Sequence, residues 1–357
     1  MKILVYPKDA NPYQSLLYDA MKKLDPGLRI SYAYSFPFIG SLPFFITVAV
    51  KRALGYRVIH IHWPSFGTRL PIPANKNLSY FVFMLTLKWI KLLGFRMVWT
   101  VHNVIPHEPQ TADDLSAMRK LAKAADAKIV HSGYTIQQMT DFGLDTNNTF
   151  VIPHGNYIGT YPDNTSAVKA RTQLNLGIND FVILFFGQIR PYKGIKELLS
   201  AFESINNPNA RLIIAGRCSD ETMVRKIKAL KGKTRIDFYE GRIADKEVGM
   251  YFKACNVVCL PFRAITTSGS ALLALSFGRP LIAPSEGALL DMPNNIGYLY
   301  DPHNPSALSE SLNQSINNSS DMMQMGQNAF EYAQTLGWSE IGRKTHVVFA
   351  GINGKQT

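Results

Sequence analysis

The first half of the chain alternates short apolar runs with longer segments whose apolar residues recur every three or four positions. Short apolar runs bounded by turn residues are typical of buried strands, and the longer spacing is typical of helices with one buried face. The strand-like runs are KILVYP, VIHIHWP, RMVWTVHN and AKIVHS, and the helical segments are YQSLLYDAMKKL, YFVFMLTLKWIKLL, LSAMRKLAKAAD and GYTIQQMTDFG. Repeated strand-then-helix order predicts a parallel, doubly wound sheet.

A polar stretch, residues 156–180, interrupts this pattern after the strand-like TFVIPHG. Strand and helix patterns then restart with FVILFFG, and 357 residues are too many for one ordinary core. We therefore predict an α/β protein of two Rossmann-like domains facing across a cleft. The first spans 1–160 and the second 161–335, and a helical segment near 336–357 could pack back on the first.

The segment FGQIRPYKG leaves the first strand of the second domain through Gly187 and places Arg190 and Lys193 before a helix. Glycines let backbone N–H groups approach a ligand, and Arg and Lys suit phosphate oxygens. A solvated turn would explain the segment if it stood alone. The arrangement nevertheless predicts an anion site at this strand end.

A second strand end in the same domain has similar properties. The small residues there open a helix, whose first N–H groups lack partners within the helix and attract phosphate. These residues are Thr267, Ser268, Gly269 and Ser270. A serine here could simply cap the helix, but two such strand ends favour a diphosphate. Tyr239 and Gly241 lie where a loop could border a base.

Histidines and other polar groups gather at the strand ends of the first domain. Open α/β sheets bind ligands at the carboxyl edge of their strands, so these side chains are candidates for binding and deprotonating hydroxyls. The candidates are Asn11, Tyr13, His60, His62, Trp63, His102, Asn103, His107, Glu108, His131, Ser132 and His154. Each histidine could also be an ordinary core residue. Their spacing is not that of a metal site, so we expect no metal.

Composition excludes several other classes. Three cysteines argue against a disulfide framework and favour a reducing compartment. The start MKILVY enters a strand pattern directly and lacks the features of a signal peptide. Pro37, Gly40 and Pro43 break the uncharged run 31–50, which favours a buried or interfacial segment over a membrane span.

The net charge of +12 is concentrated at the start of the chain: residues 1–100 hold 13 Lys or Arg and 3 Asp or Glu. Cations mixed with apolar residues, as in LSYFVFMLTLKWIKLLGFR, suit an anionic membrane surface. A solvated basic face is the ordinary alternative. Nucleic acid is another, but no recognised binding motif accompanies the charge.

Together these segments resemble a known family, the GT-B glycosyltransferases, in which two Rossmann-like domains bind a nucleotide sugar and an acceptor. FGQIRPYKG and GSALLALSFGRPLIAP resemble the donor-binding segments of the GT4-like group. With NPYQSLLYDA, VIHIHWP and TVHNVIPHE, they resemble the xanthan-type, GT94-like β-mannosyltransferases, which are inverting and use GDP-mannose. The matching pieces extend over residues 11–284.

The chain departs from the retaining GT4 pattern, which carries two glutamates separated by seven residues. Ile265 and Leu273 occupy those positions here, which puts retention and the usual ribose contact in doubt. The resemblance implies donor contacts at Gly187, Arg190, Lys193, Tyr239 and the 267–270 helix start. It implies an acceptor side containing Asn11, Tyr13, His62, Trp63, Asn103 and His154, and Asn11 and Tyr13 could instead border the donor phosphates.

An inverting enzyme needs a general base for the acceptor hydroxyl, and Glu108 and His102 are both candidates. Arg190 and Lys193 would help the diphosphate leave. The sequence therefore predicts a transferase that moves a sugar, expected to be mannose from GDP-mannose, to a lipid-linked or oligosaccharide acceptor. We expect no cofactor besides this co-substrate.

The acceptor could be carried on a polyprenyl diphosphate, which would place the protein peripherally on the inner face of the plasma membrane. Two alternatives remain open at this point. One is a UDP-sugar-dependent or retaining GT4-type enzyme, and the other is a non-catalytic binding partner with the same fold.

Overall fold

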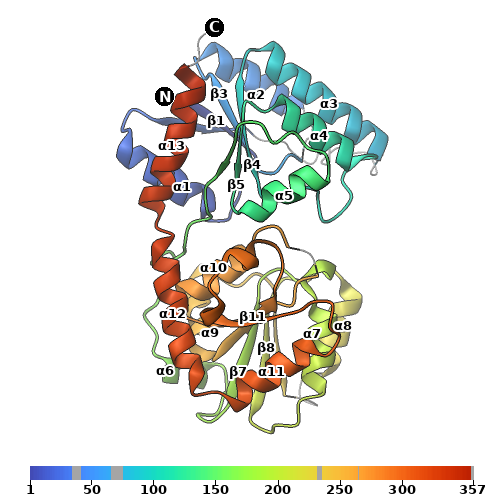
Figure 1. The fold of residues 1–357 in the computed structure, drawn as a ribbon, viewed down its shortest axis with the longest axis vertical. Helices are drawn as coiled ribbons and strands as arrows, with labels where there is room; N and C mark the ends of the chain where they lie inside the picture. Colours follow the sequence, from blue (N-terminus) through green and yellow to red (C-terminus); the bar gives the residue numbers. More distant parts are fainter. Residues whose placement is uncertain (34–41, 66–74, 231–234, 264, 355–357) are drawn as a thin grey trace. The chain divides into compact units, whose positions relative to one another are not determined.

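The computed structural model describes residues 1–33, 42–65, 75–230, 235–263 and 265–354 (Figure 1). The chain divides into two compact units. Unit 1 contains residues 1–155 and 338–357, and unit 2 contains residues 156–337. Part of the uncharged run expected to be buried or interfacial, residues 34–41 with Pro37 and Gly40, lies outside the described residues.

Unit 1 is built on a parallel sheet of six strands in the order β2-β1-β3-β4-β5-β6. Its strands are β1 (Lys2–Tyr6), β2 (Arg29–Tyr32), β3 (Val58–Ile61), β4 (Arg96–Val101), β5 (Ala127–Val130) and β6 (Thr149–Val151). Its helices are α1 (Tyr13–Leu24), α2 (Leu42–Ala53), α3 (Lys76–Leu92), α4 (Asp114–Ala124), α5 (Gly133–Asp141) and α13 (Trp338–Gly354).

Helices cover both faces of this sheet because successive strand residues point to opposite sides. Leu4 and Tyr6 of β1 pack with residues of α2, α3, α4 and α5. Ile3 and Val5, the alternate residues, pack with α1 and α13. Helix α13 lies along α1 although more than 300 residues separate them in sequence (Figure 1). The last segment of the chain is thus part of unit 1.

Unit 2 has the same plan, with strand order β12-β11-β10-β7-β8-β9. Its strands are β7 (Phe181–Phe186), β8 (Ala210–Gly216), β9 (Ile236–Glu240), β10 (Val257–Cys259), β11 (Leu281–Pro284) and β12 (Gly297–Tyr300). Its α-helices are α6 (Ala167–Gln173), α7 (Ile195–Glu203), α8 (Glu221–Leu230), α9 (Asp245–Ala254), α10 (Gly269–Ser276), α11 (Ala307–Asn317) and α12 (Asp321–Thr335). Short 3-10 helices lie at Pro191–Lys193, Gly287–Asp291 and Asn294–Ile296.

The core of unit 2 is also two-sided. Residues of α7, α8 and α11 form one apolar cluster with alternate residues of the central strands. Helices α9 and α10 contact β7 and β11, while α6 packs on α9 and α12 on α10. Both units are therefore doubly wound, as the sequence predicts, and each gathers the carboxyl ends of its strands at one edge.

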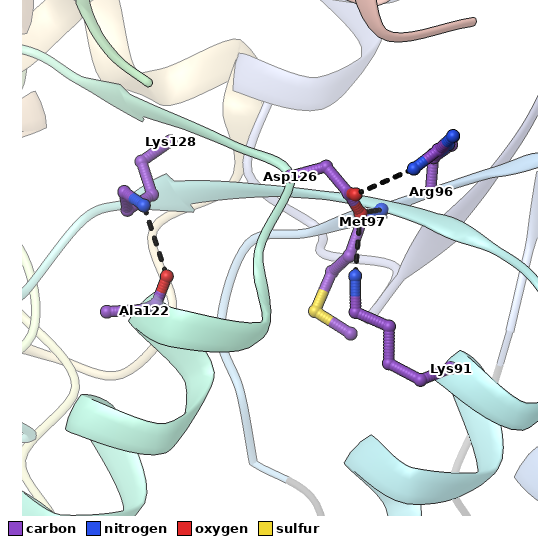
Figure 2. Close-up of polar contacts among 6 residues, drawn as sticks. All are labelled: Lys91, Arg96, Met97, Ala122, Asp126 and Lys128. Atoms are coloured by element: carbon purple, nitrogen blue, oxygen red, sulfur yellow. Dashed lines mark hydrogen bonds and ion pairs between the residues drawn. The ribbon is translucent and has the colours of Figure 1, made fainter. Parts of the chain in front are cut away.

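Two of the basic residues counted over 1–100, Lys91 and Arg96, pair with an acidic side chain, and Lys128, further along the chain, is buried (Figure 2). The carboxylate of Asp126 accepts hydrogen bonds from Lys91 Nζ at 2.8 Å and from the backbone N–H of Met97 at 2.7 Å. It also pairs with Arg96 at 3.3 Å. Buried Lys128 donates to the carbonyl of Ala122 at 3.1 Å. The sequence count therefore overstates the charge available to a partner.

Candidate functional site

Five buried histidines meet at the carboxyl edge of the unit 1 sheet, and we call them the histidine cluster: His60, His62, His102, His131 and His154. His60 lies on β3, and the others follow β3, β4, β5 and β6. The carboxyl ends of parallel strands share an edge, which brings these residues together.

The ring of Tyr13, the first residue of α1, lies among four members of the cluster. Its centroid is 5.7 Å from that of His62, 5.2 Å from His102, 5.5 Å from His131 and 4.7 Å from His154. Trp338, at the start of α13, lies 5.4 Å from the same ring. The cluster is thus packed among aromatic side chains from both ends of the chain.

Hydrogen bonds link three of the histidines into a row with two hydroxyls, and we call this row the hydroxyl–imidazole chain. Thr100 Oγ1 lies 2.7 Å from His60 Nε2, and His60 Nδ1 lies 2.6 Å from the hydroxyl of Tyr18. That hydroxyl lies 3.0 Å from His62 Nε2, and His62 Nδ1 lies 3.1 Å from His102 Nε2. All five side chains are buried, so the row is a largely dry network.

The other two histidines are held by backbone carbonyls. His131 Nδ1 donates to the carbonyl of Ile152 at 2.9 Å, and His154 Nδ1 donates to that of Gly155 at 2.7 Å. An imidazole that donates through Nδ1 while neutral leaves Nε2 bare. In His131 this nitrogen is buried and has no hydrogen-bond partner among the described residues.

Burial keeps the whole cluster uncharged at neutral pH. It lowers the pKa of His60 to about 3, of His131 to about 4 and of His154 to about 3. Burial also lowers the pKa values of His62 and His102 well below the ordinary range, and neighbouring histidines lower them further. The cluster therefore offers neutral hydrogen-bonding groups.

The structure brings together most residues expected on the acceptor side. Tyr13, His62, His102 and His154 lie in one group, and Trp63 stacks on His102 with ring centroids 4.4 Å apart. Both ring nitrogens of His62 already bond protein groups, so His62 helps to hold Tyr18 and His102 in place.

The remaining acceptor-side candidates lie in loops. The side-chain oxygen of Asn11 accepts a hydrogen bond from the backbone N–H of Tyr13 at 2.9 Å, which fixes the start of α1. Asn103 and Glu108 follow His102 in the loop before α4. Asn103 is half-buried, and Glu108 is exposed.

The described residues contain no group of three or more His, Cys, Asp or Glu that could hold a metal ion. In the cluster, both ring nitrogens of His60 and His62 and one nitrogen of each other histidine bond hydroxyls, carbonyls or another imidazole. The cluster therefore forms a neutral hydrogen-bonding network.

Unit 2 presents a different kind of strand end, which we call the cationic loop, residues 187–194. Gly187 has a φ of +127° and Gly194 a φ of +70°, a region that favours glycine. A Cβ on Gly194 would lie 1.7 Å from the carbonyl oxygen of Pro261, and one on Gly216 would lie 1.8 Å from that of Gly187. These positions require glycine because backbone segments approach closely.

The cations of the loop are held at its 3-10 turn. Arg190 precedes the turn Pro191–Lys193 and is half-buried. Lys193 Nζ lies 4.2 Å from the centroid of the Phe262 ring, a cation–π distance. Burial lowers the pKa of Lys193 to about 8. The described residues place no carboxylate within ion-pair distance of Lys193, so its charge is available to an anion.

The start of α10 adjoins this loop. Ser268 caps the helix by accepting from the N–H of Ala271 at 3.0 Å. Ser270 Oγ lies 3.5 Å from the position that a Cβ on Gly187 would occupy. The hydroxyl of neighbouring Thr267 is buried without a hydrogen-bond partner in the described part of the chain. The two strand ends predicted to bind phosphate are therefore adjacent in unit 2.

Tyr239 has a packing role in the structure. Its ring lies edge-on to Tyr251 at 5.3 Å, and its hydroxyl approaches the carbonyl of Leu174 at 3.5 Å. Gly241 has a φ of +121° and nothing within 4 Å of an added Cβ. A contact between Tyr239 and a base stays a prediction.

Some residues of the site carry no signal in the sequence. Tyr18 and Thr100 have the spacing of ordinary core positions in a helix and a strand. Trp338 joins the cluster only because α13 packs on unit 1, and Gly155 leaves room for its indole.

Comparison with known proteins bears on the family and the fold. Residues 168–332 match the family model described as Glycosyl transferases group 1. A GDP-mannose:glycolipid 4-beta-D-mannosyltransferase of Xanthomonas campestris pv. campestris is 26% identical over 309 residues, covering 84% of this chain and 78% of that protein. A D-inositol 3-phosphate glycosyltransferase of Corynebacterium glutamicum is 26% identical over 62% of this chain and 56% of its own length.

Solved structures share the fold. HepE of Anabaena, solved with UDP and glucose, has a TM-score of 0.76 at 20% identity, covering 98% of this chain and all of that one. Sucrose-phosphate synthase of Thermosynechococcus elongatus also has a TM-score of 0.76 at 20% identity, covering 99% of each chain. Residues 168–332 therefore carry a segment of the Glycosyl transferases group 1 family, and the chain as a whole has the GT-B fold.

Proposed function

We propose that the protein transfers mannose from GDP-mannose to a lipid-linked or oligosaccharide acceptor with inversion, in the synthesis of a cell-surface polysaccharide or glycolipid. The likeness to the Xanthomonas mannosyltransferase over most of both chains carries this proposal. Ile265 and Leu273, at the positions of the two glutamates of retaining relatives, are both buried and apolar. Neither can contact a ribose hydroxyl or a sugar as a carboxylate would.

In this proposal the cationic loop and the start of α10 hold the donor diphosphate. The acceptor hydroxyl oxygen attacks C1 of mannose as the bond from C1 to the diphosphate oxygen breaks. GDP leaves with the electron pair, and Arg190, Lys193 and the α10 N–H groups offset its negative charge. The adjacency of Gly187 and Ser270 supports one diphosphate spanning both segments.

Glu108 takes the proton of the attacking hydroxyl in this mechanism. Glu108 is exposed and its side chain offers carboxyl oxygens to a proton, whereas burial lowers the pKa of His102 well below its ordinary range. His102 and Asn103 then position the substrate by hydrogen bonding. Glu108→Gln keeps the shape and removes the base, so it should reduce transfer by about a hundredfold or more.

Peripheral attachment to the cytoplasmic face of an anionic membrane accompanies this function. Large apolar side chains are exposed at every fourth position along α2 and just after it, at Leu42, Ile46, Val50 and Leu54, and along one side of α3, at Phe81, Leu85 and Leu92. No Asp or Glu lies between Asp25 and Glu108, and Lys76 and Lys88 are exposed beside these stripes. Apolar stripes with flanking cations suit an anionic lipid surface.

No helix among the described residues is long and apolar enough to cross a bilayer. Vesicle flotation tests the surface interaction. Wild type should float with vesicles of anionic lipid, and Ile46→Glu with Phe81→Glu should abolish this. Ile178→Glu, an equally exposed apolar position in unit 2, should have no effect. Equal flotation of all variants would contradict attachment through α2 and α3.

Donor hydrolysis in the absence of acceptor tests the transferase activity directly. GDP-mannose should be consumed and UDP-glucose and UDP-glucuronate should not, and Arg190→Ala should lose this activity. Consumption of a UDP-sugar instead would support the alternative donor, as in the HepE structure with UDP and glucose. If no sugar nucleotide is hydrolysed or bound, a non-catalytic binding protein becomes the better description.

A further inference from the structure

The hydroxyl–imidazole chain has only two possible proton arrangements while its histidines are neutral. A neutral imidazole has one N–H and one bare nitrogen, so each histidine donates through one nitrogen and accepts through the other. Tyr18 contacts His60 and His62 with one hydroxyl proton, so it donates to one and accepts from the other. All protons along the row must therefore point the same way.

The two arrangements differ at the end that faces the site. In the first, Thr100 donates to His60 Nε2, and every histidine of the row carries its proton on Nδ1, so that His102 presents an Nδ1–H group. In the second, every proton lies on Nε2, and His60 donates to Thr100. His102 then presents a bare Nδ1 that could accept a proton.

Thr100 decides between these arrangements. It is fully buried, and His60 Nε2, at 2.7 Å, is the only hydrogen-bond partner of its side chain among the described residues. In the second arrangement the Thr100 hydroxyl proton would be buried without an acceptor, which is unfavourable. In the first arrangement every donor inside the row is satisfied, and the one N–H without a partner among the described residues is that of His102 Nδ1, at the least buried end.

We propose that Thr100 is a positioning residue that orients the hydroxyl–imidazole chain, so that His102 presents an Nδ1–H donor to an oxygen atom of the bound substrate. The contact with substrate rests on the proposed function, whereas the orientation of the chain does not. His102 is the most exposed member of the row, at 9%, and its Nδ1 has no partner among the described residues. This assignment removes His102 as a general base and leaves that role to Glu108.

Among the residues that the structure describes, no carboxylate hydrogen-bonds to the histidines of the row or shifts their pKa values. The groups against His102 are the rings of Tyr13, Trp63 and His131, with His154 beyond Tyr13. His131 and His154 carry their protons on Nδ1 because backbone carbonyls accept from them. They serve as internal references, since neither depends on Thr100.

Nitrogen-15 NMR of the full chain labelled at histidine tests the proposal, with signals assigned by single His→Gln variants. In wild type, His60, His62 and His102 should all have the Nδ1–H form, like His131 and His154. Thr100→Ser keeps the hydroxyl and should keep these forms. Thr100→Val keeps the volume and removes the donor, so His102 should populate the Nε2–H form while His131 and His154 stay unchanged.

An Nε2–H form of His102 in wild type would overturn the proposal, as would an unchanged spectrum in Thr100→Val. If Thr100→Val fails to fold, the wild-type and Thr100→Ser spectra still decide the orientation. In turnover of GDP-mannose, Thr100→Val should lower kcat about tenfold and Thr100→Ser should retain it. Absence of turnover in wild type, with the expected NMR forms, would reject the proposed function and leave the role of Thr100 in place.

Discussion

The two units share one architecture but differ in the charge and packing of the side chains at the carboxyl edges of their sheets. The histidine cluster of unit 1 is uncharged, closely packed and hydrogen-bonded within itself. The cationic loop of unit 2 contains glycines that allow close backbone approach, and Lys193 forms no ion pair with a described carboxylate. The start of α10 lies beside this loop. One fold thus presents an uncharged hydrogen-bonding cluster at one sheet edge and a loop with two cations at the other.

This contrast can be measured separately in each unit. The chain has four tryptophans, Trp63, Trp89, Trp99 and Trp338, and all lie in unit 1. Its three cysteines, Cys218, Cys255 and Cys259, all lie in unit 2. Tryptophan fluorescence therefore reports the unfolding of unit 1, and reaction of buried Cys255 and Cys259 with a thiol reagent reports that of unit 2.

Mild acid should produce the largest effect, and only in unit 1. The folded-state pKa values of His60, His131 and His154 lie below the unfolded value near 6.5, so unfolding takes up protons below that pH. Stability is complete above pH 6.5 and falls towards pH 3–4. These three histidines alone should remove about 6 kcal/mol between pH 7 and pH 5.

Urea titrations followed by tryptophan fluorescence at several pH values check this. His60→Gln should reduce the pH slope by about one proton, or about 1.4 kcal/mol per pH unit. Equal stability of unit 1 at pH 7 and pH 5 would show that the cluster is not buried and neutral.

Gly194→Ala should have the next largest effect and act on unit 2. The added Cβ would overlap the carbonyl oxygen of Pro261, and the φ of +70° is unfavourable for alanine, so the cationic loop must move. We expect a loss of about 3 kcal/mol and of GDP binding. Thiol reaction and calorimetric titration measure the two effects.

Gly159 provides a matched control in the same unit, with a φ of +71° and open space around an added Cβ. Gly159→Ala should lose only about 1–2 kcal/mol from the backbone. If both variants lose equal stability, close approach to Pro261 is not what requires glycine at position 194.

Gly155→Ala should weaken unit 1 by about 1–3 kcal/mol, because the new Cβ would lie 2.3 Å from the Trp338 indole. The indole contacts Tyr13 and His154, so the cluster should loosen with it. Gly351→Ala, in open space on α13, should instead be neutral or slightly stabilising. Tryptophan fluorescence compares the two, and equal curves would argue against tight packing around Trp338.

Raising the pH should have the smallest effect and should weaken nucleotide binding. Lys193, with a pKa of about 8, loses its charge as the pH rises through that value, so GDP should bind about tenfold more weakly near pH 9.5. Its depressed pKa also means that apo unit 2 gains stability between pH 8 and the unfolded value near 10.4. Lys193→Arg should remove the change in affinity, and an identical pH profile in both proteins would exclude Lys193 from the site.

The sequence predicts the architecture well because periodicity reports burial directly. Strand and helix patterns identify both doubly wound sheets. The segment FGQIRPYKG identifies the cationic loop because cations rarely serve as core residues. Tyr18 and Thr100 escape prediction because their spacing is that of core residues. Their role depends on which side chains the strand order β1-β3-β4 brings together, and no local pattern encodes that contact.

Calorimetric titration of GDP and UDP into wild type, Arg190→Ala and His62→Gln tests most directly whether unit 2 alone holds the donor nucleotide. GDP should bind wild type and His62→Gln with similar affinity, bind Arg190→Ala at least tenfold more weakly, and bind wild type better than UDP does. Equal GDP affinity in wild type and Arg190→Ala, or a loss confined to His62→Gln, would contradict the assignment of the diphosphate to the cationic loop.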